Sequence, residues 1–149
     1  LLGAVGSENR SAIDRPTVDA WVAEGVVEYL GTTADVRPAI AAASCVVLPS
    51  YREGAPRTLI EAAAMARPLI ATDVPGCRAV VDRDISGFLC DVRNAESLAA
   101  AMERFLALSP QAQKAMGAAG RERALHHFSV QVMLEQTLAF YAEAMGRSP

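Results

Sequence analysis

Short apolar runs alternate along the chain with stretches of helical periodicity, and this alternation limits the possible folds more than any other feature. The runs cover residues 1–5, 26–30, 45–48, 68–72 and 87–90. Each is four or five residues long, too short for a buried helix, and turn residues such as Gly6, Gly31 and Pro49 end them. Strands separated by helices are typical of βα units on a parallel sheet. We therefore expect an α/β fold, a doubly wound parallel sheet with helices on both faces.

Helix-capping residues predict where the helical segments begin. We expect helices over residues 16–24, 35–43, 56–66 and 77–81, the last after a turn at residues 73–76. Beyond residue 94 the chain is predicted to be a helical tail, with caps at Asn94, Ser109 and Ser129. Apolar residues at helical spacing predict packing faces there: Leu98, Met102, Phe105 and Leu106 in one helix, and Leu134, Leu138 and Tyr141 in another.

Composition favours one globular domain and argues against nucleic acid as a partner. The chain has 149 residues, 52% of them hydrophobic, which is enough for one core. A net charge of −3 does not favour binding to a phosphate backbone. A local basic patch near residue 57 remains possible, formed by Arg52, Arg57, Arg67 and Arg78. We find no linker or repeat and predict a single domain over residues 1–149.

The cysteines and histidines do not predict a metal site. Cys45, Cys77 and Cys90 lie far apart and are expected to be small apolar residues in a reducing compartment. His126 and His127 fit a helix C-terminus better than a ligand pair. No run of 18 apolar residues and no signal peptide occurs.

The stretch after the apolar run 45–48 has the features of an anion site. Pro56 suits a first helical position, which would leave the amides of Arg57, Thr58 and Leu59 free at the start of a helix. The helix dipole favours an anion there, and a diphosphate would fit. Gly54 and Ala55 are small enough for a ligand to approach the backbone.

Two carboxylates flank this predicted anion site. Glu53 precedes the helix, and Glu61 lies inside it, roughly 7 Å beyond its start at ~1.5 Å per residue. Carboxylates accept hydrogen bonds from sugar hydroxyls. The spacing assigns Glu53 to a transferred sugar and Glu61 to a ribose, as in a sugar nucleotide. Two glutamates at this spacing are also common, and Glu61 could be an ordinary surface residue.

The ordered motifs resemble the donor-binding half of family 4 (group 1) retaining glycosyltransferases. They are Leu48-Pro49-Ser50, Glu53-Gly54, Glu61-Ala62, residues 68–72 and Gly76, with Tyr29-Leu30-Gly31 upstream and Gly87-Phe88-Leu89 and Phe128-Ser129 downstream. Residues 50–54 and 3–9 are similar to a bacterial subgroup that builds surface polysaccharides, such as lipopolysaccharide, and lipid-linked oligosaccharides.

The resemblance implies a GT-B architecture of two Rossmann-like domains and transfer of a sugar, with retention, from a nucleotide-diphosphate sugar such as a UDP-sugar. Glu53 would be the catalytic residue that contacts the donor sugar, with the backbone of residues 54–59 on sugar and diphosphate and Glu61 on the ribose. Gly31 and Thr33, in the loop 31–36, would line the base. No metal cofactor is implied. The resemblance also implies a cytoplasmic enzyme, with the membrane's inner face as a second location and a saccharide or lipid-linked saccharide as acceptor.

The chain departs from the family pattern at two places. Ala66-Arg67-Pro68 replaces a Gly-x-Pro sequence, and Ala55-Pro56 replaces a frequent Phe-Gly pair.

The abrupt apolar start at Leu1 leads us to expect a piece of a longer protein. The family's diphosphate-binding Arg and Lys and its acceptor domain would precede Leu1, so we expect no turnover by the chain alone.

Two other functions remain open on the sequence. A non-catalytic nucleotide-sugar-binding or assembly module would keep the fold without the acceptor domain, and the parent gene would distinguish it. A GT-B sugar-nucleotide epimerase would need acids and a histidine around the donor, and no histidine lies near Glu53 in the sequence.

Overall fold

The computed structural model describes residues 1–6 and 12–146 of the chain. It divides the chain into two compact units, Leu1–Pro38 and Ala39–Pro149, and each is described by itself below. Residues 7–9 of the predicted subgroup motif lie outside the described residues. The single domain predicted over residues 1–149 stays a prediction.

The first unit holds one helix, α1 (Arg15–Ala23), close to the predicted bounds. Asp14 caps it, because its Oδ1 accepts the amide of Thr17 at 2.9 Å. Arg15 and Asp19, one turn apart, form an ion pair of 2.7 Å on its surface. Local polar contacts therefore stabilise this helix at its start and on its surface.

The strands predicted over residues 1–5 and 26–30 are wrong as regular strands, since the described part of the first unit contains none. The two segments still run side by side: the Leu30 amide donates to Leu1 O and the Gly3 amide to Gly31 O, both at 2.8 Å. Gly31 adopts a positive φ of 69°. This left-handed residue turns the second segment out of an extended course, which explains why the pairing does not continue.

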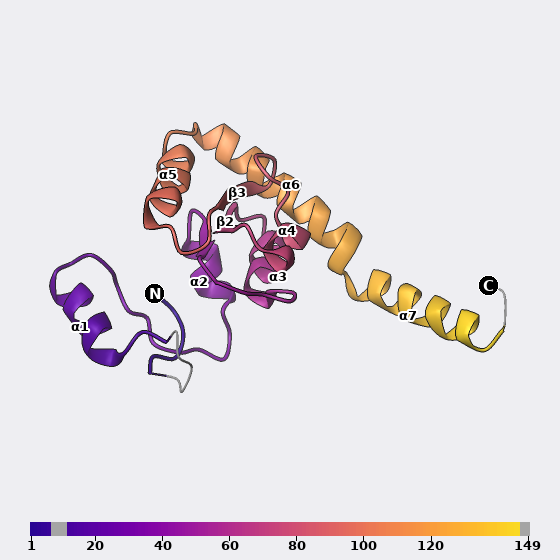
Figure 1. Cartoon of the computed structure of the whole chain (residues 1–149). Coiled ribbons are helices and arrows are strands. Elements are labelled where there is room, and N and C mark those ends of the chain that lie inside the picture. The colour runs from indigo at the N-terminus through magenta and orange to yellow at the C-terminus, as the bar shows by residue number, and fades with distance from the viewer. Residues whose placement is uncertain (7–11, 147–149) are drawn as a thin grey trace. The chain divides into compact units, whose positions relative to one another are not determined.

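The second unit contains a three-stranded parallel sheet of order β1-β2-β3 (Figure 1). Its strands are β1 (Val46–Leu48), β2 (Leu69–Thr72) and β3 (Gly87–Cys90), within a residue of the predicted runs. In this register Val47 pairs with Ile70, and Ile70 with Phe88. The residues of β2 and β3 are all buried, as expected for parallel strands covered on both faces.

Helices cover both faces of this sheet, so the predicted α/β fold class is confirmed. Figure 1 shows α5 (Ala95–Leu106) on one side of the strands and α3 (Arg57–Ala64) and α4 (Pro75–Val80) on the other. The core on the α5 side consists of Ile70, Phe88, Cys90, Ala101, Phe105 and Met116. The side chains of α3 that are fully buried are Leu59, Ala62 and Ala63.

The short helices begin one or two residues away from their predicted starts. Helix α2 (Arg37–Ala42), which crosses the boundary between the units, begins at Arg37 instead of Asp35. Pro56 is the N-cap of α3, not its first helical residue. Helix α4 begins at Pro75, inside the predicted turn, because the fixed φ of proline suits the first helical position.

The helical tail has the predicted caps. Asn94 accepts the Ser97 amide at 2.9 Å at the start of α5, and Ser109 accepts that of Ala112 at 3.2 Å at the start of α6 (Pro110–Phe128). Ser129 does the same for α7 (Val130–Ala144), accepting the amide of Val132 at 3.3 Å. Each cap satisfies one of the amides that a helix start leaves free.

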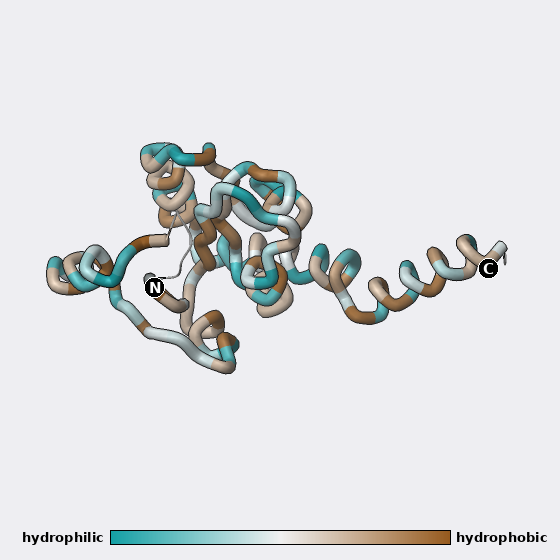
Figure 2. The backbone as a smooth tube through the Cα atoms, turned by 60° about the horizontal axis from the view of Figure 1, so that its bottom comes forward, coloured by the Kyte–Doolittle hydropathy of each residue, from teal (hydrophilic) through white to brown (hydrophobic). Residues whose placement is uncertain are grey.

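The predicted packing faces of the tail are only partly covered by the described residues. In α5, Phe105 is buried, whereas Leu106 is 73% exposed. Helix α7 has no buried residue, and Leu134, Leu138 and Tyr141 are all more than half exposed. The brown, hydrophobic stretches near the C-terminus in Figure 2 belong to this helix. Periodicity marked an apolar face there, but the second unit does not cover it.

Helix α6 lies against the C-terminal ends of α3 and α4. Arg121 donates through Nη1 to the Ala64 carbonyl, and Arg123 donates through Nε and Nη2 to the Ala79 carbonyl at 3.2 and 3.0 Å. A Cβ on Gly117 would lie 2.9 Å from the carbonyl carbon of Ala66 and even closer to its oxygen. These contacts hold α3 and α4 at the ends opposite to their N-termini.

We predict that Gly117→Ala lowers the free energy of unfolding by about 1–3 kcal/mol, because the new methyl group meets backbone that must shift. The matched control is Gly120→Ala on the same helix, where the nearest atom would be Ser86 Cβ at 3.5 Å. That substitution should be neutral or stabilise by up to about 1 kcal/mol through helix propensity. Urea unfolding of both variants measures the difference, and equal stabilities would contradict the prediction.

Candidate functional site

The candidate site lies at the carboxyl edge of the sheet, where the segments that follow the strands come together. Residues 50–56, here called the Glu53 loop, follow β1 and lead into α3. The segment after β2 starts α4, and Arg93, after β3, places its guanidinium 4.9 Å from the ring centre of Tyr51. In parallel α/β sheets this edge is where ligands bind.

The start of α3 offers fewer free amides than the sequence predicted. The Leu59 amide donates to the Pro56 carbonyl at 3.0 Å, so the expectation that it is free is wrong. A tightened first turn uses this donor inside the helix. The amides of Arg57 and Thr58 have no hydrogen-bond acceptor among the described residues. These two donors and the helix dipole make the start of α3 suitable for an anion.

Along the chain, one of the two glutamates precedes this helix start and the other follows it. Glu53 is half-buried in the loop before α3. Glu61 lies inside α3, and its side chain is 40% exposed. The Oε1 of Glu61 lies 3.6 Å from Nη2 of Arg57, whose side chain is 90% exposed. Because exposed pairs of this kind contribute little energy, Glu61 can exchange this partner for a ligand hydroxyl at small cost.

The predicted basic patch does not form as one cluster. Arg78 pairs with Asp73 at 2.7 Å, and Asp73 also pairs with Arg83 at 2.5 Å. The hydrogen bond from Arg78 is the main reason why the pKa of Asp73 lies below its ordinary value. Arg67 follows the C-terminal end of α3, away from the Glu53 loop, and its buried Nε has no hydrogen-bond partner within residues 1–6 and 12–146.

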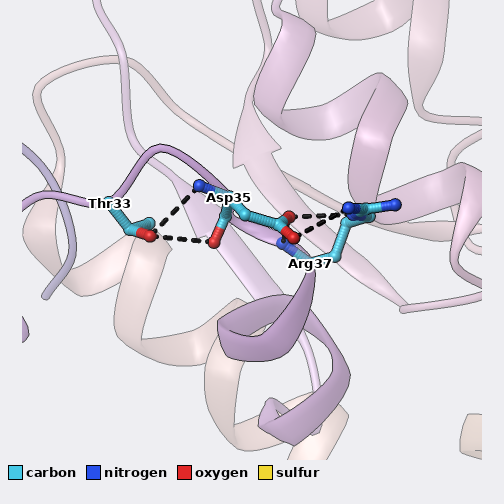
Figure 3. Close-up of polar contacts among 3 residues, drawn as sticks. All are labelled: Thr33, Asp35 and Arg37. Carbon is cyan, nitrogen blue, oxygen red and sulfur yellow. Dashed lines mark hydrogen bonds and ion pairs between the residues drawn. The ribbon is translucent and has the colours of Figure 1, made fainter.

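Gly31 and Thr33 belong to the first unit, and their predicted contact with the base stays a prediction. Thr33 forms a tight local network with Asp35 and Arg37 (Figure 3). Its Oγ1 accepts the Asp35 amide at 3.1 Å, and Asp35 accepts Nε and Nη2 of Arg37 at 2.8 Å each. The hydrogen bonds from Arg37 lower the pKa of Asp35 to about 2. The network therefore fixes the loop that precedes α2.

The described residues contain no group of three His, Cys, Asp or Glu side chains that could hold a metal ion. Cys45, Cys77 and Cys90 are free, and burial raises the pKa of all three thiols.

Among the described helices, none is long and apolar enough to cross a membrane. In the first unit an open hollow of about 290 Å³ borders Val5, Ile13 and Tyr29, but none of the predicted site residues lines it.

Sequence reasoning missed two residues that contact the Glu53 loop, Thr72 and Gly76. Thr72 Oγ1 donates to the Ser50 carbonyl, and Gly76 lies directly against the backbone of Glu53 and Gly54. Thr72 had appeared as a strand end and Gly76 as a turn glycine. Two signals were available: both residues belong to the motifs that carry the family resemblance, and Thr72 places a hydroxyl at the carboxyl end of a buried strand. Neither signal identifies the residues that they contact.

Comparison with known proteins assigns the chain to a family. Residues 2–107 match the family model of the glycosyl transferases group 1, and the chain therefore belongs to this family. It is 31% identical to a D-inositol 3-phosphate glycosyltransferase from Salinispora tropica, over 95% of this chain and 30% of the relative. It is 32% identical to an N,N'-diacetylbacillosaminyl-diphospho-undecaprenol alpha-1,3-N-acetylgalactosaminyltransferase from Campylobacter jejuni, over 50% of this chain and 20% of the relative. The chain thus spans less than a third of the length of either.

Solved structures support the same fold. Sucrose-phosphate synthase from Thermosynechococcus elongatus matches with a TM-score of 0.82 and 28% identity, over 97% of this chain and 38% of that one. Anabaena HepE, solved in complex with UDP, matches with a TM-score of 0.77 and 22% identity, over 86% of this chain and 35% of its own. These matches confirm the predicted Rossmann-like fold of GT-B glycosyltransferases.

We predict that the Asp35 carboxyl titrates at about 2 and that Arg37→Gln raises this pKa toward the ordinary 3.8. Because the folded-state pKa is the lower one, the pair stabilises the loop above pH 3.8 and loses this effect as the pH falls through about 2. Carbon-13 NMR of the side-chain carboxyl measures both values. Arg15→Gln, which removes a different ion pair, is the control and should leave Asp35 unchanged.

Proposed function

We propose that the chain is the donor-binding part of a retaining glycosyltransferase that uses a nucleotide-diphosphate sugar. The observation that carries the proposal is that Glu53 precedes the start of α3 and Glu61 follows it, in a chain of the group 1 glycosyl transferases. A diphosphate at the Arg57 and Thr58 amides would then have one carboxylate toward the sugar and the other toward the ribose.

We propose that the nucleotide of the sugar donor is UDP. Support comes from the structural relatives: HepE is described in complexes with UDP and with UDP-glucose, and the pneumococcal O-GlcNAc transferase GtfA in complex with UDP and GlcNAc. In our proposal Glu53 orients the sugar and Glu61 the ribose, and Arg57, released from Glu61, turns toward the diphosphate. Residues 31 and 33 would contact the base.

The proposed reaction exchanges one bond to the anomeric carbon for another. The bond from that carbon to the diphosphate oxygen breaks, and a bond to the acceptor oxygen forms on the same face of the ring. The acceptor hydroxyl proton passes to the diphosphate that leaves. Charge develops on the diphosphate, where the α3 amides and arginine side chains would stabilise it, so we propose that no metal is needed.

The acceptor is a separate proposal. The Campylobacter relative is named for a diphospho-undecaprenol substrate, and another, TuaC of Bacillus subtilis, for teichuronic acid biosynthesis. We propose a saccharide or lipid-linked saccharide of a bacterial surface polysaccharide, handled on the cytoplasmic side of the membrane. The chain spans less than a third of the curated relatives' length, and we propose that alone it binds the donor without transferring the sugar.

We predict that the chain binds UDP and UDP-glucose and that Glu61→Ala weakens both about tenfold, because a hydrogen bond between a carboxylate and ribose is lost. Glu53→Ala should weaken UDP-glucose and leave UDP unchanged, since Glu53 is assigned to the sugar. Titration calorimetry measures the affinity of each protein for both ligands. Glu103→Ala, an exposed glutamate on α5, is the matched control and should behave as the unchanged chain.

Two results would contradict the proposal. One is a chain that is folded by circular dichroism and binds no UDP, ADP, GDP or UDP-glucose. The other is binding that Glu61→Ala and Glu103→Ala weaken equally, which would place the nucleotide elsewhere.

A further inference from the structure

The Glu53 loop is held by the segment that follows β2, about twenty residues further along the chain. Thr72, the last residue of β2, is 2% exposed and donates its Oγ1 hydrogen to the Ser50 carbonyl. Among the described residues no other hydrogen bond joins residues 50–55 to another part of the chain. Thr72 is therefore the polar anchor of this loop.

The second contact is steric. A Cβ on Gly76 would lie 2.5 Å from the Gly54 carbonyl oxygen and 2.6 Å from the Glu53 carbonyl carbon. Gly76 does not have a positive φ, so glycine is needed here for space and not for backbone freedom. The backbone of Glu53 and Gly54 thus packs directly against the first turn of α4.

Helix α4 is itself held in place by several contacts. Pro75 occupies the first turn of α4, and Arg123 of α6 binds the Ala79 carbonyl near its other end. Asp73 pairs with Arg78 of the same helix at 2.7 Å. A shift of the Glu53 loop would therefore have to displace a helix that is held at both ends.

Cys77 follows Gly76 in the first turn of α4. Cys77 is fully buried, and burial is the main reason why its pKa is raised. A hydrogen bond with Thr72 lowers the pKa of this thiol, and the charge of Glu53 raises it. The pKa of the Cys77 thiol is thus influenced by both Thr72 and Glu53.

We propose that Thr72 and Gly76 are positioning residues for the sugar-binding carboxylate of Glu53, which they hold through the backbone of residues 50–54. The inference rests on the proposed role of Glu53. Neither residue would touch the nucleotide, since Glu61 and the α3 amides are assigned to it. Their loss should therefore affect the sugar and spare the nucleotide.

The test compares four variants of the 149-residue chain. Thr72→Val removes the hydroxyl but keeps the shape, and Thr72→Ser retains the hydroxyl. Gly76→Ala places a methyl group against the backbone of Glu53 and Gly54. Gly117→Ala imposes a similar clash at the opposite end of α3 and controls for a general loss of stability.

Two measurements give the answer. The nitrogen-15 order parameters of the Glu53 and Gly54 amides should fall from about 0.85 toward 0.6 in Thr72→Val and Gly76→Ala. Calorimetry should show the Kd of UDP-glucose raised about three- to tenfold in both, with the Kd of UDP changed less than about twofold. Thr72→Ser and Gly117→Ala should retain the order parameters and the ratio of the two affinities.

Unchanged order parameters and an unchanged UDP-glucose Kd in Thr72→Val would overturn the inference, as would equal losses for UDP and UDP-glucose. If Gly76→Ala does not fold, Thr72→Val and Thr72→Ser decide the question. If the unchanged chain binds neither probe, the proposed function fails, and the order parameters alone then decide whether Thr72 and Gly76 position the loop.

Discussion

The parallel pairing of β1 and β3 with β2 is the constraint on which the second unit depends. Its register places the ends of the strands side by side, so that the Glu53 loop follows β1 directly beside Thr72, at the end of β2. Burial of β2 and β3 on both faces makes a slip of register costly, because every side chain would change faces and lose its close-packed neighbours. The site is thus an outcome of core packing, and the polar groups at the edge take their positions from it.

Helix α3 connects that core with the proposed chemistry. Its fully buried side chains, Leu59, Ala62 and Ala63, are small enough for close packing, and α6 holds its C-terminal end through Arg121 and Gly117. At the opposite end, two amides lack a partner in the part of the chain that the structure describes, and Arg57 and Glu61 form a weak, exposed pair. A rigid helix with an unsatisfied start suits a ligand that brings negative charge, since binding requires little rearrangement.

Most of the second unit's elements were predictable from local signals. Apolar runs located the three strands within a residue, and Asn94, Ser109 and Ser129 capped their helices as expected, because capping depends on residues three apart. The strands predicted in the first unit are absent from its described residues, because Gly3 inside the first run has a φ of 139° and the left-handed Gly31 ends the second run. The free amide predicted at Leu59 was also wrong, because whether a first turn tightens depends on backbone geometry that residue type does not specify.

The sequence by itself determined the fold class, the family and the two glutamates, because periodicity and the order of motifs depend only on the order of the residues along the chain. Only the tertiary structure decided what holds Glu53. The Thr72 hydroxyl and the space left by Gly76 act on residues about twenty positions earlier, and such contacts arise when two parallel strands bring their following loops together. Tertiary structure also decided that the apolar face of α7 stays exposed in the second unit, since periodicity predicts a face but does not name what covers it.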